Sequence, residues 1–375
     1  MKMFIKKKMI CFFLLVIFLV LISGCGGNEK VKSGADDPVI DDHVIQVGFF
    51  NCDMMVACPV AYYGGIYEKY GLNVEITMTN QIGVMMAAGQ MDVGYMGTNA
   101  INSALNQGTP AKMVAFNHLG GSFYVVGSNE INSPQDLLGK RFCMDADEHD
   151  VNPEWRIMAH NADISYDPQD YEIYSMSQRD SYFALKIGEL DAIMVCDPWC
   201  SLAEYEGIGK EVMVSKKLTD GDWGWKTALM MTDGFREEHP ELADKVLQAH
   251  VEAIKYLYTN PVESGKIFSE TFDVPEEVGL LTIYRKTVGE GRTMTWEISK
   301  SAVERYYKMA KDEFNMAYWQ DSVSPEKWVD NSMQEKLDFE DFDTFIKEEV
   351  DPVYPLGMSF EEWKEKAYEM YEGAS

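Results

Sequence analysis

The chain has 375 residues, of which 46% are hydrophobic and 25% charged. This balance is typical of a folded globular protein and excludes wholesale disorder and fibrous repeats. Lys and Arg total 33 against 61 Asp and Glu, so the formal net charge is −28. A chain this acidic does not neutralise phosphates, and we expect neither a nucleic-acid partner nor peripheral docking on anionic lipid. At roughly 100–200 residues per domain, the length predicts two domains or lobes.

The first 25 residues have the pattern of a lipoprotein signal peptide. Four lysines lie within residues 1–8, and residues 9–22 are an unbroken apolar run of 14 residues. Such a run is shorter than a transmembrane helix needs and typical of a signal peptide. Residues 21–25 read Leu-Ile-Ser-Gly-Cys, which looks like a bacterial lipobox. We expect lipidation of Cys25 and anchoring of the protein on the outer face of the cytoplasmic membrane. An ordinary secretory peptide is the alternative.

Residues 26–44 are polar, contain glycine and show no periodicity, so we expect a flexible tether. Short strands and helices then alternate. We predict strands at 44–50, 73–76, 91–96 and 111–116, and helices at 59–70, 83–88 and 98–107. Gly71, Gly89 and Gly108 follow these helices. The alternation indicates βαβ units and a mostly parallel sheet.

The alternation starts again in the second third of the chain. We predict strands at 141–144, 171–174 and 192–195, and helices at 134–138, 153–161 and 181–188. A strand at 227–231 precedes long amphipathic helices from Pro240 onward. The tail is predicted to be helical and acidic, with Trp328, Phe345 and Trp363 as packing anchors. Two α/β lobes in series are the simplest account of this pattern.

Four short motifs occur in the same order as in one known family. They read Gly-Leu-Asn-Val-Glu at 71–75, Ala-Ala-Gly-Gln-Met-Asp-Val-Gly-Tyr-Met-Gly at 87–97, Asp-Leu-Leu-Gly-Lys at 136–140, and Gly-Glu-Leu-Asp-Ala at 188–192 with Pro198 after it. The chain resembles the solute-binding lipoproteins of ABC transporters, in the nitrate/sulfonate/taurine and thiamine-precursor family. The resemblance implies an α/β, type II periplasmic-binding-protein fold, in which two crossover hinge strands join two lobes.

The resemblance also implies domain boundaries and partners. We expect a signal peptide at 1–25, a tether at 26–44, lobe 1 at 45–126 plus 228–324, lobe 2 at 127–227, and a helical extension at 325–375 packing on lobe 1. The hinge is expected near residues 125–127 and 225–227. The partners would be a small solute, an ABC permease and its ATPase. We expect a monomer without a cofactor.

The carboxyl ends of the strands indicate where a ligand would bind, because open α/β sheets bind ligands there. The candidate ligand-binding residues are Asn51, Cys52, Asp53, Asn80, Gln81, Gly97, Thr98, Asn99, Asn117, His118, Asp145, Asp147, Glu148, Asp197, Trp199 and Trp223. Thr98 or Asn99 is expected to cap the next helix and leave N–H groups aimed at a ligand. The structural alternatives are a plain N-cap at Thr98 and a solvated charge cluster around Asp147.

Four acidic residues within 145–150 bear on the identity of the solute. At ~4 Å and an effective dielectric near 20, each like charge costs about 4 kcal/mol. We therefore expect a neutral or cationic nitrogen-containing solute, such as a pyrimidine precursor of thiamine. Aromatic residues near strand ends, among them Phe50 and Tyr95, would stack on its ring. An anion of the nitrate, sulfonate or taurine type is the alternative.

Five cysteines remain after Cys11 and Cys25: Cys52, Cys58, Cys143, Cys196 and Cys200. An odd number outside the cytosol leaves at least one thiol free. Their spacing matches no zinc motif, so we expect no metal site. A soft-metal-binding or sensory lipoprotein is the alternative, because cysteine and methionine cluster near strand ends.

Catalytic motifs are missing from the sequence. It contains no Gly-x-Ser-x-Gly, His-Glu-x-x-His, P-loop or Rossmann fingerprint. We therefore expect a binding protein rather than an enzyme. Some pyrimidine-synthesising proteins have the same fold, but such biosynthesis is cytosolic and would require an uncleaved N-terminal segment.

Overall fold

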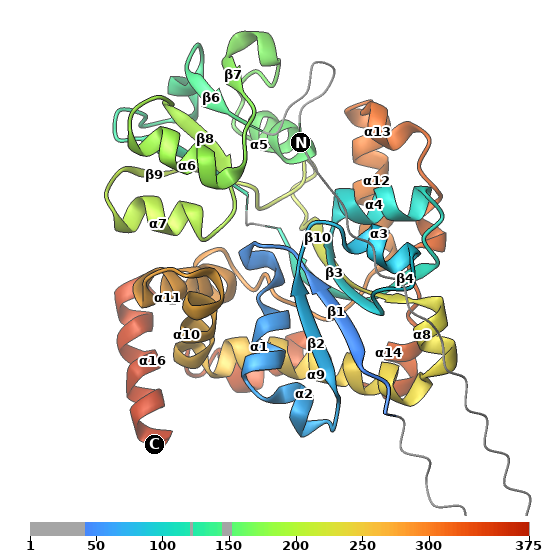
Figure 1. The fold of residues 1–375 in the computed structure, drawn as a ribbon. Coiled ribbons are helices and arrows are strands. Elements are labelled where there is room, and N and C mark those ends of the chain that lie inside the picture. The colour runs from blue at the N-terminus through green and yellow to red at the C-terminus, as the bar shows by residue number, and fades with distance from the viewer. Residues whose placement is uncertain (1–41, 121–122, 145–151, 375) are drawn as a thin grey trace, which may run out of the picture. The chain divides into compact units, whose positions relative to one another are not determined.

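The computed structural model describes residues 42–120, 123–144 and 152–374 (Figure 1). The predicted signal peptide, Cys25, most of the tether and the acidic residues Asp145, Asp147 and Glu148 lie outside the described residues. Two five-stranded sheets, each flanked by helices, organise the described chain. Within the described ranges, no helix is both long enough and apolar enough to cross a membrane.

Sheet A is mixed and joins the first strands of the chain to one that returns much later. In order across the sheet, its strands are β2 (Val74–Met78), β1 (Ile45–Phe49), β3 (Val93–Gly97), β10 (Trp225–Thr232) and β4 (Ala111–Leu119). β1 is parallel to β2 and β3, whereas β10 is antiparallel to both β3 and β4. The predicted strands at 44–50, 73–76, 91–96, 111–116 and 227–231 are confirmed, and β4 and β10 are longer than predicted.

Sheet B repeats this connectivity. Its strands in spatial order are β7 (Glu172–Tyr174), β6 (Arg141–Cys143), β8 (Ala192–Val195), β5 (Tyr124–Ser128) and β9 (Gly209–Val214). β5 pairs antiparallel with β8 and β9, as β10 does with its neighbours in sheet A. The chain leaves sheet A after β4 and re-enters it at β10, so two connections link the sheets. This is the arrangement of a type II periplasmic-binding-protein fold, as predicted.

Helices cover both faces of sheet A. They are α1 (Ala57–Tyr63), α2 (Ile66–Lys69), α3 (Ile82–Ala87), α4 (Thr98–Asn106), α8 (Asp233–Glu238), α9 (Pro240–Thr259), α10 (Pro261–Phe272) and α11 (Glu276–Tyr284), with short turns η1 (Asp53–Met55) and η4 (Arg285–Gly289). Side chains that alternate along β10 enter different cores. Leu229 packs in the core with α1, α9 and α10, while Met230 packs in the core with α3 and α4.

One predicted helix, 59–70, is two helices in the structure. α1 ends before Gly64, and Gly65 has a φ of +71° ahead of α2. This left-handed conformation costs little only in glycine, because glycine has no Cβ. The Gly64-Gly65 pair therefore turns the chain between the two helices.

Sheet B carries shorter helices. They are α5 (Pro153–Asn161), α6 (Gln178–Lys186) and α7 (Trp199–Tyr205), with the turns η2 (Pro134–Leu137) and η3 (Pro168–Asp170). The Asn152 side chain accepts a hydrogen bond from the Glu154 N–H, and Pro153 occupies the first helical position. Both choices favour a helix start, because the first N–H groups of a helix have no partner within it. They place Glu154 in the first turn of α5.

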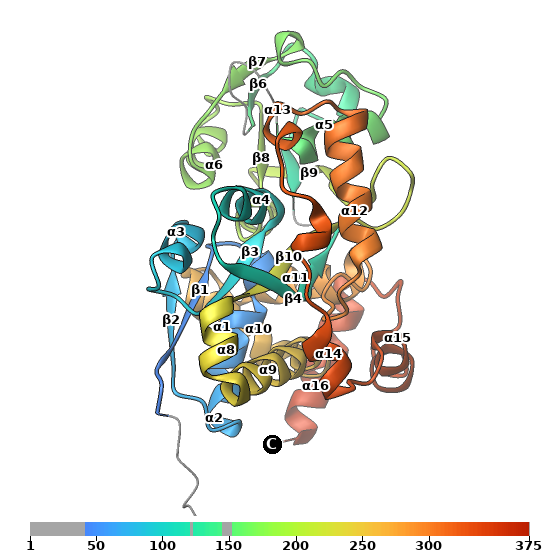
Figure 2. The same ribbon diagram turned by 90° about the vertical axis from the view of Figure 1, so that its right-hand side faces the viewer.

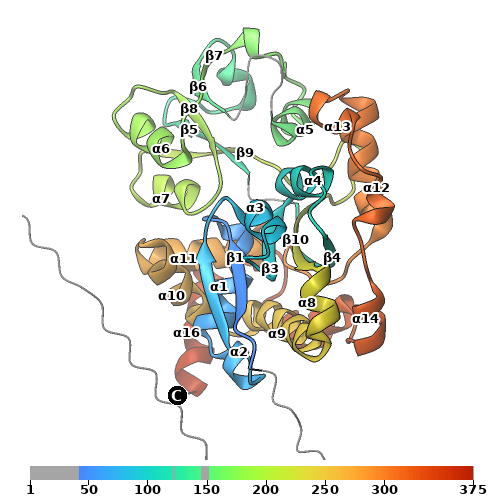
Figure 3. The ribbon, with the colours of Figure 1, turned by 45° about the vertical axis from the view of Figure 1, so that its right-hand side comes forward.

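Residues 300–374 run along the molecule to the helices of sheet B and return to the side of sheet A (Figures 2 and 3). Their elements are α12 (Lys300–Lys308), η5 (Met309–Glu313), α13 (Ala317–Gln320), η6 (Pro325–Lys327), α14 (Ser332–Leu337), α15 (Phe342–Phe345), η7 (Ile346–Val350) and α16 (Phe360–Ala374). Met113 of β4 donates its N–H to the Trp328 carbonyl at 2.8 Å. Arg156 of α5 donates to the Phe314 carbonyl at 3.0 Å. This segment therefore contacts elements of both sheets.

Candidate functional site

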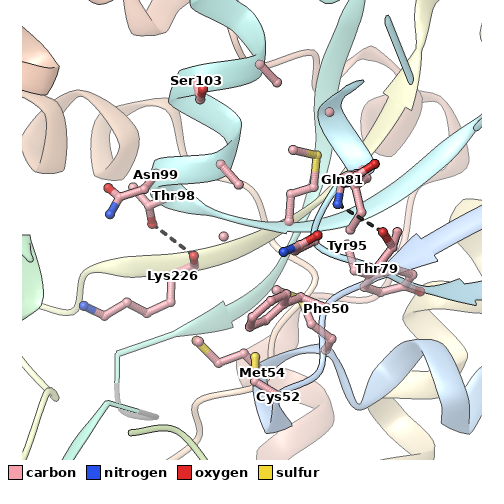
Figure 4. Close-up of a pocket in the computed structure, with 18 of the residues that line it drawn as sticks. Phe50, Cys52, Met54, Thr79, Gln81, Tyr95, Thr98, Asn99, Ser103 and Lys226 are labelled. Atoms are coloured by element: carbon pink, nitrogen blue, oxygen red, sulfur yellow. Dashed lines mark hydrogen bonds between the residues drawn. The ribbon is translucent and has the colours of Figure 1, made fainter. Parts of the chain in front are cut away.

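A cavity of about 570 Å³ lies between the carboxyl ends of the strands of the two sheets. From sheet A, its wall includes the residues after β1 and β2, the start of α3, the end of β3 and the whole first turn of α4. From sheet B come Asn152 and Glu154 at the start of α5, Gln178 of α6, and Cys196 after β8. Figure 4 shows the sheet A side of this wall. The position is the one that strand geometry predicts for a ligand.

The start of α4 forms one side of the cavity. Gly97 has an extended backbone, with φ −83° and ψ 163°, and the helix begins directly at Thr98. No side chain caps the helix. The Thr98 hydroxyl instead donates a hydrogen bond of 3.0 Å to the Lys226 carbonyl of β10 (Figure 4). The prediction that Thr98 or Asn99 caps this helix is therefore wrong. The N-terminal partial positive charge of α4 nevertheless faces the cavity wall.

The described wall carries one cation and one anion, and they contact each other. The Lys226 ammonium forms a buried ion pair with the Glu154 carboxylate. Tyr306 of α12 donates its hydroxyl to the other carboxylate oxygen of Glu154 at 2.9 Å. Burial, followed by the charge of Glu154, raises the pKa of Tyr306. The fixed charges of the described wall therefore cancel.

Uncharged polar groups and apolar surfaces make up the rest of the wall. The uncharged polar lining residues are Thr79, Asn80, Gln81, Thr98, Asn99, Ser103, Gln107, Thr109, Asn152 and Gln178, with Tyr306. Aromatic rings come from Phe50, Tyr95 and Phe123, and thioethers from Met54, Met55 and Met96. The Phe50 ring is 37% exposed and points into the cavity between these groups (Figure 4). Amides and hydroxyls beside an apolar floor suit a small molecule with a planar body and several hydrogen-bonding groups.

A buried group of charged residues that includes Asp53 of η1 is linked to sheet B by hydrogen bonds. The Lys286 ammonium lies 2.9 Å from the Asp53 carboxylate and 3.0 Å from that of Glu290, and it donates to the Tyr124 hydroxyl of β5 at 2.9 Å. Burial by itself lowers the pKa of Lys286, but the carboxylates of Asp53 and Glu290 outweigh it and raise the pKa above its ordinary value. The Asp53 N–H also donates to the Asp197 carbonyl at 3.2 Å.

Asp197 belongs to a second group of this kind. Its carboxylate accepts hydrogen bonds from the Ser201 hydroxyl at 2.8 Å and from the Thr282 hydroxyl at 3.1 Å, and lies 3.4 Å from the Arg285 guanidinium. Arg285 and Thr282 belong to η4 and α11, next to sheet A, while Asp197 follows β8 of sheet B. Asp197 therefore connects the sheets rather than lining the cavity.

The predicted site residues separate into three groups. Those that line the cavity are Cys52, Asn80, Gln81, Gly97, Thr98 and Asn99. Those placed away from its wall are Asn51, Asp53, Asn117, His118, Asp197, Trp199 and Trp223. Those outside the described residues are Asp145, Asp147 and Glu148. Asn117 bonds the Met54 carbonyl and so positions η1 beneath the cavity. Burial, followed by the charges of Lys286 and Lys226, lowers the pKa of His118.

The polar wall residues that sequence reasoning missed include Asn152, Glu154, Gln178, Lys226 and Tyr306. Gln178 and Glu154 lie in the first turns of α6 and α5, and only the packing of sheet B against sheet A turns them toward the cavity. Lys226 lies within a predicted hinge strand. The only sign of its role in the sequence is that a charged residue stands in an otherwise apolar strand. Tyr306 lies in α12, more than 70 residues after Lys226 in the sequence, and only the fold brings it to the cavity wall.

Comparisons with known proteins give the same fold. The sequence model of the NMT1-like family matches residues 41–267. The taurine-binding periplasmic protein of Escherichia coli (strain K12) is 25% identical over 183 residues, which are 47% of this chain and 54% of that protein. The chain thus matches about half the length of this curated relative.

Two solved structures are similar over most of the chain. The ligand-binding component of an ABC-type import system from Staphylococcus aureus, solved with zinc bound, has a TM-score of 0.61 and 14% identity, covering 78% of this chain and 98% of that one. The periplasmic aliphatic sulphonate-binding protein of Escherichia coli has a TM-score of 0.61 and 14% identity, covering 76% and 91%. At this identity the likeness shows the fold alone. All three of these proteins are binding proteins. The chain belongs to the NMT1-like family and has the fold of type II periplasmic binding proteins.

Proposed function

We propose that the chain is an extracytoplasmic, lipid-anchored solute-binding protein of an ABC importer. Family membership and the binding proteins named above support the general role. The lipobox-like sequence ending at Cys25 supports the anchor. The observation that carries the proposal is the cavity between the carboxyl ends of two sheets, with uncharged polar groups contributed by both sheets.

We infer further that the solute is small, nitrogen-containing and without net negative charge. Relatives of this chain bind taurine or aliphatic sulphonates, whose sulfonate group is stabilised by positive charge or by N–H donors around it. Here Lys226, the one cation in the described wall, is already neutralised by Glu154. A heteroaromatic ring such as a pyrimidine needs only hydrogen bonds and a flat apolar contact. The amides of Asn80, Gln81 and Gln178 and the Phe50 ring offer these.

Capture would work by closing the two sheets around the solute. Asn80 and Gln81 lie on the sheet A side and Gln178 on the sheet B side, so a solute that bonds to all of them favours the closed arrangement. A ligand stabilises a closed state only by binding that state better than the open one. The permease would then recognise the closed form and receive the solute.

Isothermal titration calorimetry with four probes tests the proposal. The probes are an aminopyrimidine, cytosine, taurine and a short alkanesulfonate. We expect binding of at least one pyrimidine, and a tenfold or greater loss of affinity in Gln178→Ala. Gln169→Ala, which removes an exposed amide of the same sheet outside the cavity, serves as the matched control. Tight binding of a sulfonate with no binding of either pyrimidine would overturn the inferred solute class but not the receptor role.

An anionic solute is the second candidate, and one observation favours it. The first turn of α4 lies in the cavity wall without a side-chain cap, and helix N-termini attract anions. The same calorimetric panel separates the two candidates. A sulfonate bound at α4 would occupy the cavity in place of a pyrimidine, so the panel shows which of the two classes binds.

A further inference from the structure

The fold brings together two cysteines that lie 144 positions apart in sequence. Cys52 lies just before η1 and Cys196 just after β8, so one belongs to the sheet A side of the molecule and the other to the sheet B side. Their Sγ atoms and a carboxylate oxygen of Asp53 lie within 4.8 Å of one another. All three residues are almost completely buried, with at most 1% of their surface exposed. Two sulfur donors and one oxygen donor thus converge on one point.

Neighbouring groups hold these donors in place. The Cys196 N–H donates to the Gln178 amide oxygen at 2.8 Å, and the Gln178 amide nitrogen lies 3.8 Å from the Cys196 sulfur. The Lys286 ammonium lies 2.9 Å from the Asp53 carboxylate. Hydrogen bonds of this kind around thiolate and carboxylate ligands are typical of metal sites, because they orient the ligands and stabilise their charge.

The cluster can be reached from the cavity. Cys52, Cys196 and Gln178 all line the cavity wall, and Met54 presents its thioether on the same side as Cys52 (Figure 4). The cavity is therefore the side from which an ion would approach the two buried sulfurs. A water molecule in the cavity would be able to complete the coordination.

We propose that Cys52, Cys196 and Asp53 form a binding site for one thiophilic divalent cation, of which Zn²⁺ is the representative. Three protein ligands with a fourth position open to a cavity is an arrangement that zinc readily adopts. This site goes beyond solute capture. It rests on this chain's own residues, since likeness to the zinc-containing Staphylococcus aureus structure at 14% identity shows only the fold.

Charge balance favours a divalent ion over a monovalent soft ion such as Cu(I). Metal binding displaces the protons of both thiols, which pass to solvent. The two protons remove two positive charges and a divalent ion brings two back. The buried site, with its neighbours Asp53, Lys286 and Glu290, therefore keeps its net charge. A monovalent ion would leave one additional negative charge inside the protein, and uncompensated buried charge is costly.

A second group of similar donors is less suited to bind a metal ion. The ligand atoms of Cys200, Glu204 and Glu211 also lie within 4.8 Å of one another. The Arg285 guanidinium already occupies that place, 2.9 Å from Glu204 and 3.6 Å from Glu211. Arg285 thus pairs with two of the three possible ligands of that group. In the proposed site, Lys286 pairs with Asp53 alone among the three ligands, and neither thiol is paired with a cation within the described residues.

The test uses the full chain, reduced and freed of metal by chelation. Zn²⁺ is titrated in competition with a chromophoric chelator, and Co²⁺ is added separately as a spectroscopic probe. We expect one ion per chain and a sulfur-to-cobalt charge-transfer band. Cys52→Ser and Cys196→Ser should each weaken binding at least tenfold and lose the band. Cys58→Ser, a buried cysteine of α1 outside the cluster, should behave as the wild type.

Two further outcomes decide the proposal. No ion bound above the chelator background, or unchanged binding in Cys52→Ser and Cys196→Ser, would overturn it. X-ray absorption at the zinc edge of the wild-type protein covers the case in which a variant does not fold: two sulfur ligands are expected, and none would contradict the site. Solute calorimetry on the metal-free protein tests the receptor role separately, so failure of one proposal does not imply failure of the other.

Discussion

The Lys226 ammonium and the Glu154 carboxylate form a buried ion pair between β10 of sheet A and α5 beside sheet B. Only 3% of the Lys226 side chain and 5% of that of Glu154 are exposed. The pair lies in the cavity wall, so it both neutralises the site and joins the sheets. Tyr306 and Ser215 donate further hydrogen bonds to the same carboxylate.

We predict that Lys226→Met destabilises the protein by about 3–5 kcal/mol, because it leaves the buried Glu154 carboxylate without its cation. The double variant Lys226→Met with Glu154→Gln should recover much of this loss. Urea unfolding followed by tryptophan fluorescence measures both. Lys366→Met, which removes the exposed partner of Glu369, is the control and should change little. Equal stability of Lys226→Met and wild type would show that the pair is not formed.

Removal of the Phe50 ring should weaken solute binding without unfolding the protein. The ring is 37% exposed, so Phe50→Ala forms no core cavity. Stacking on an aromatic ring contributes about 0.5–1.5 kcal/mol beyond contact area, so we expect a loss of affinity of about two- to tenfold. Calorimetry with the best solute of the panel measures it. Tyr205→Ala, an exposed ring of α7, is the control, and an equal loss in both variants would rule out stacking on Phe50.

The buried His250 should make the protein less stable in acid. Burial lowers its pKa to about 4, against about 6.5 in an unfolded chain. Its ring bonds the Phe116 carbonyl at 2.8 Å and the Tyr95 hydroxyl at 3.2 Å. As pH falls below 6.5, the unfolded chain takes up a proton that the folded chain refuses until about pH 4. The free energy of unfolding therefore falls with pH between these two values.

The His250→Gln variant isolates this contribution. Its amide can still donate to the Phe116 carbonyl, but it does not titrate. Between pH 6 and pH 4.5 the slope of unfolding free energy against pH should be smaller than in the wild type by about 1 kcal/mol per pH unit, somewhat less than the value for one whole proton. His118, whose pKa is also lowered, contributes to both proteins and cancels in the difference. Identical slopes would contradict a neutral, buried His250.

Gly279 controls how closely α11 packs on α10. A Cβ atom at this position would collide with the Ser269 hydroxyl and the Gly265 carbonyl of α10. Gly279→Ala should therefore destabilise the protein by about 1–3 kcal/mol, and it should displace Thr282 and Arg285 from Asp197. Thermal unfolding measures the first effect. Gly234→Ala in α8, where a Cβ meets open space, should be neutral or slightly stabilising. If Gly279→Ala leaves the stability unchanged, α10 and α11 can move apart without loss of folding free energy, which would contradict the prediction.

Strands with a clear apolar pattern in the sequence were predicted well. A strand that forms mainly because it pairs with a neighbouring strand was not predicted. β1 and β8 are short apolar runs bounded by polar or turn residues, and the prediction matches them to within one or two residues. β9 was missed because Lys210 and Glu211 interrupt its apolar pattern. Apart from Met213, its side chains are only partly buried at the edge of sheet B, where a strand needs one apolar face at most.

The sequence by itself determined the alternation of strands and helices, the family motifs, and the loops at the strand ends where Gln81 and Thr98 meet the cavity. These features depend on residues close together in the chain, whose backbone preferences and polarity can be read directly. Only the tertiary structure decided that Asp53 and Asp197 bind internal cations, that Glu154 neutralises Lys226, and that Cys52 faces Cys196. Each of these pairs joins segments 70 or more residues apart, and such contacts arise from how the two sheets pack, a geometry that no local pattern encodes.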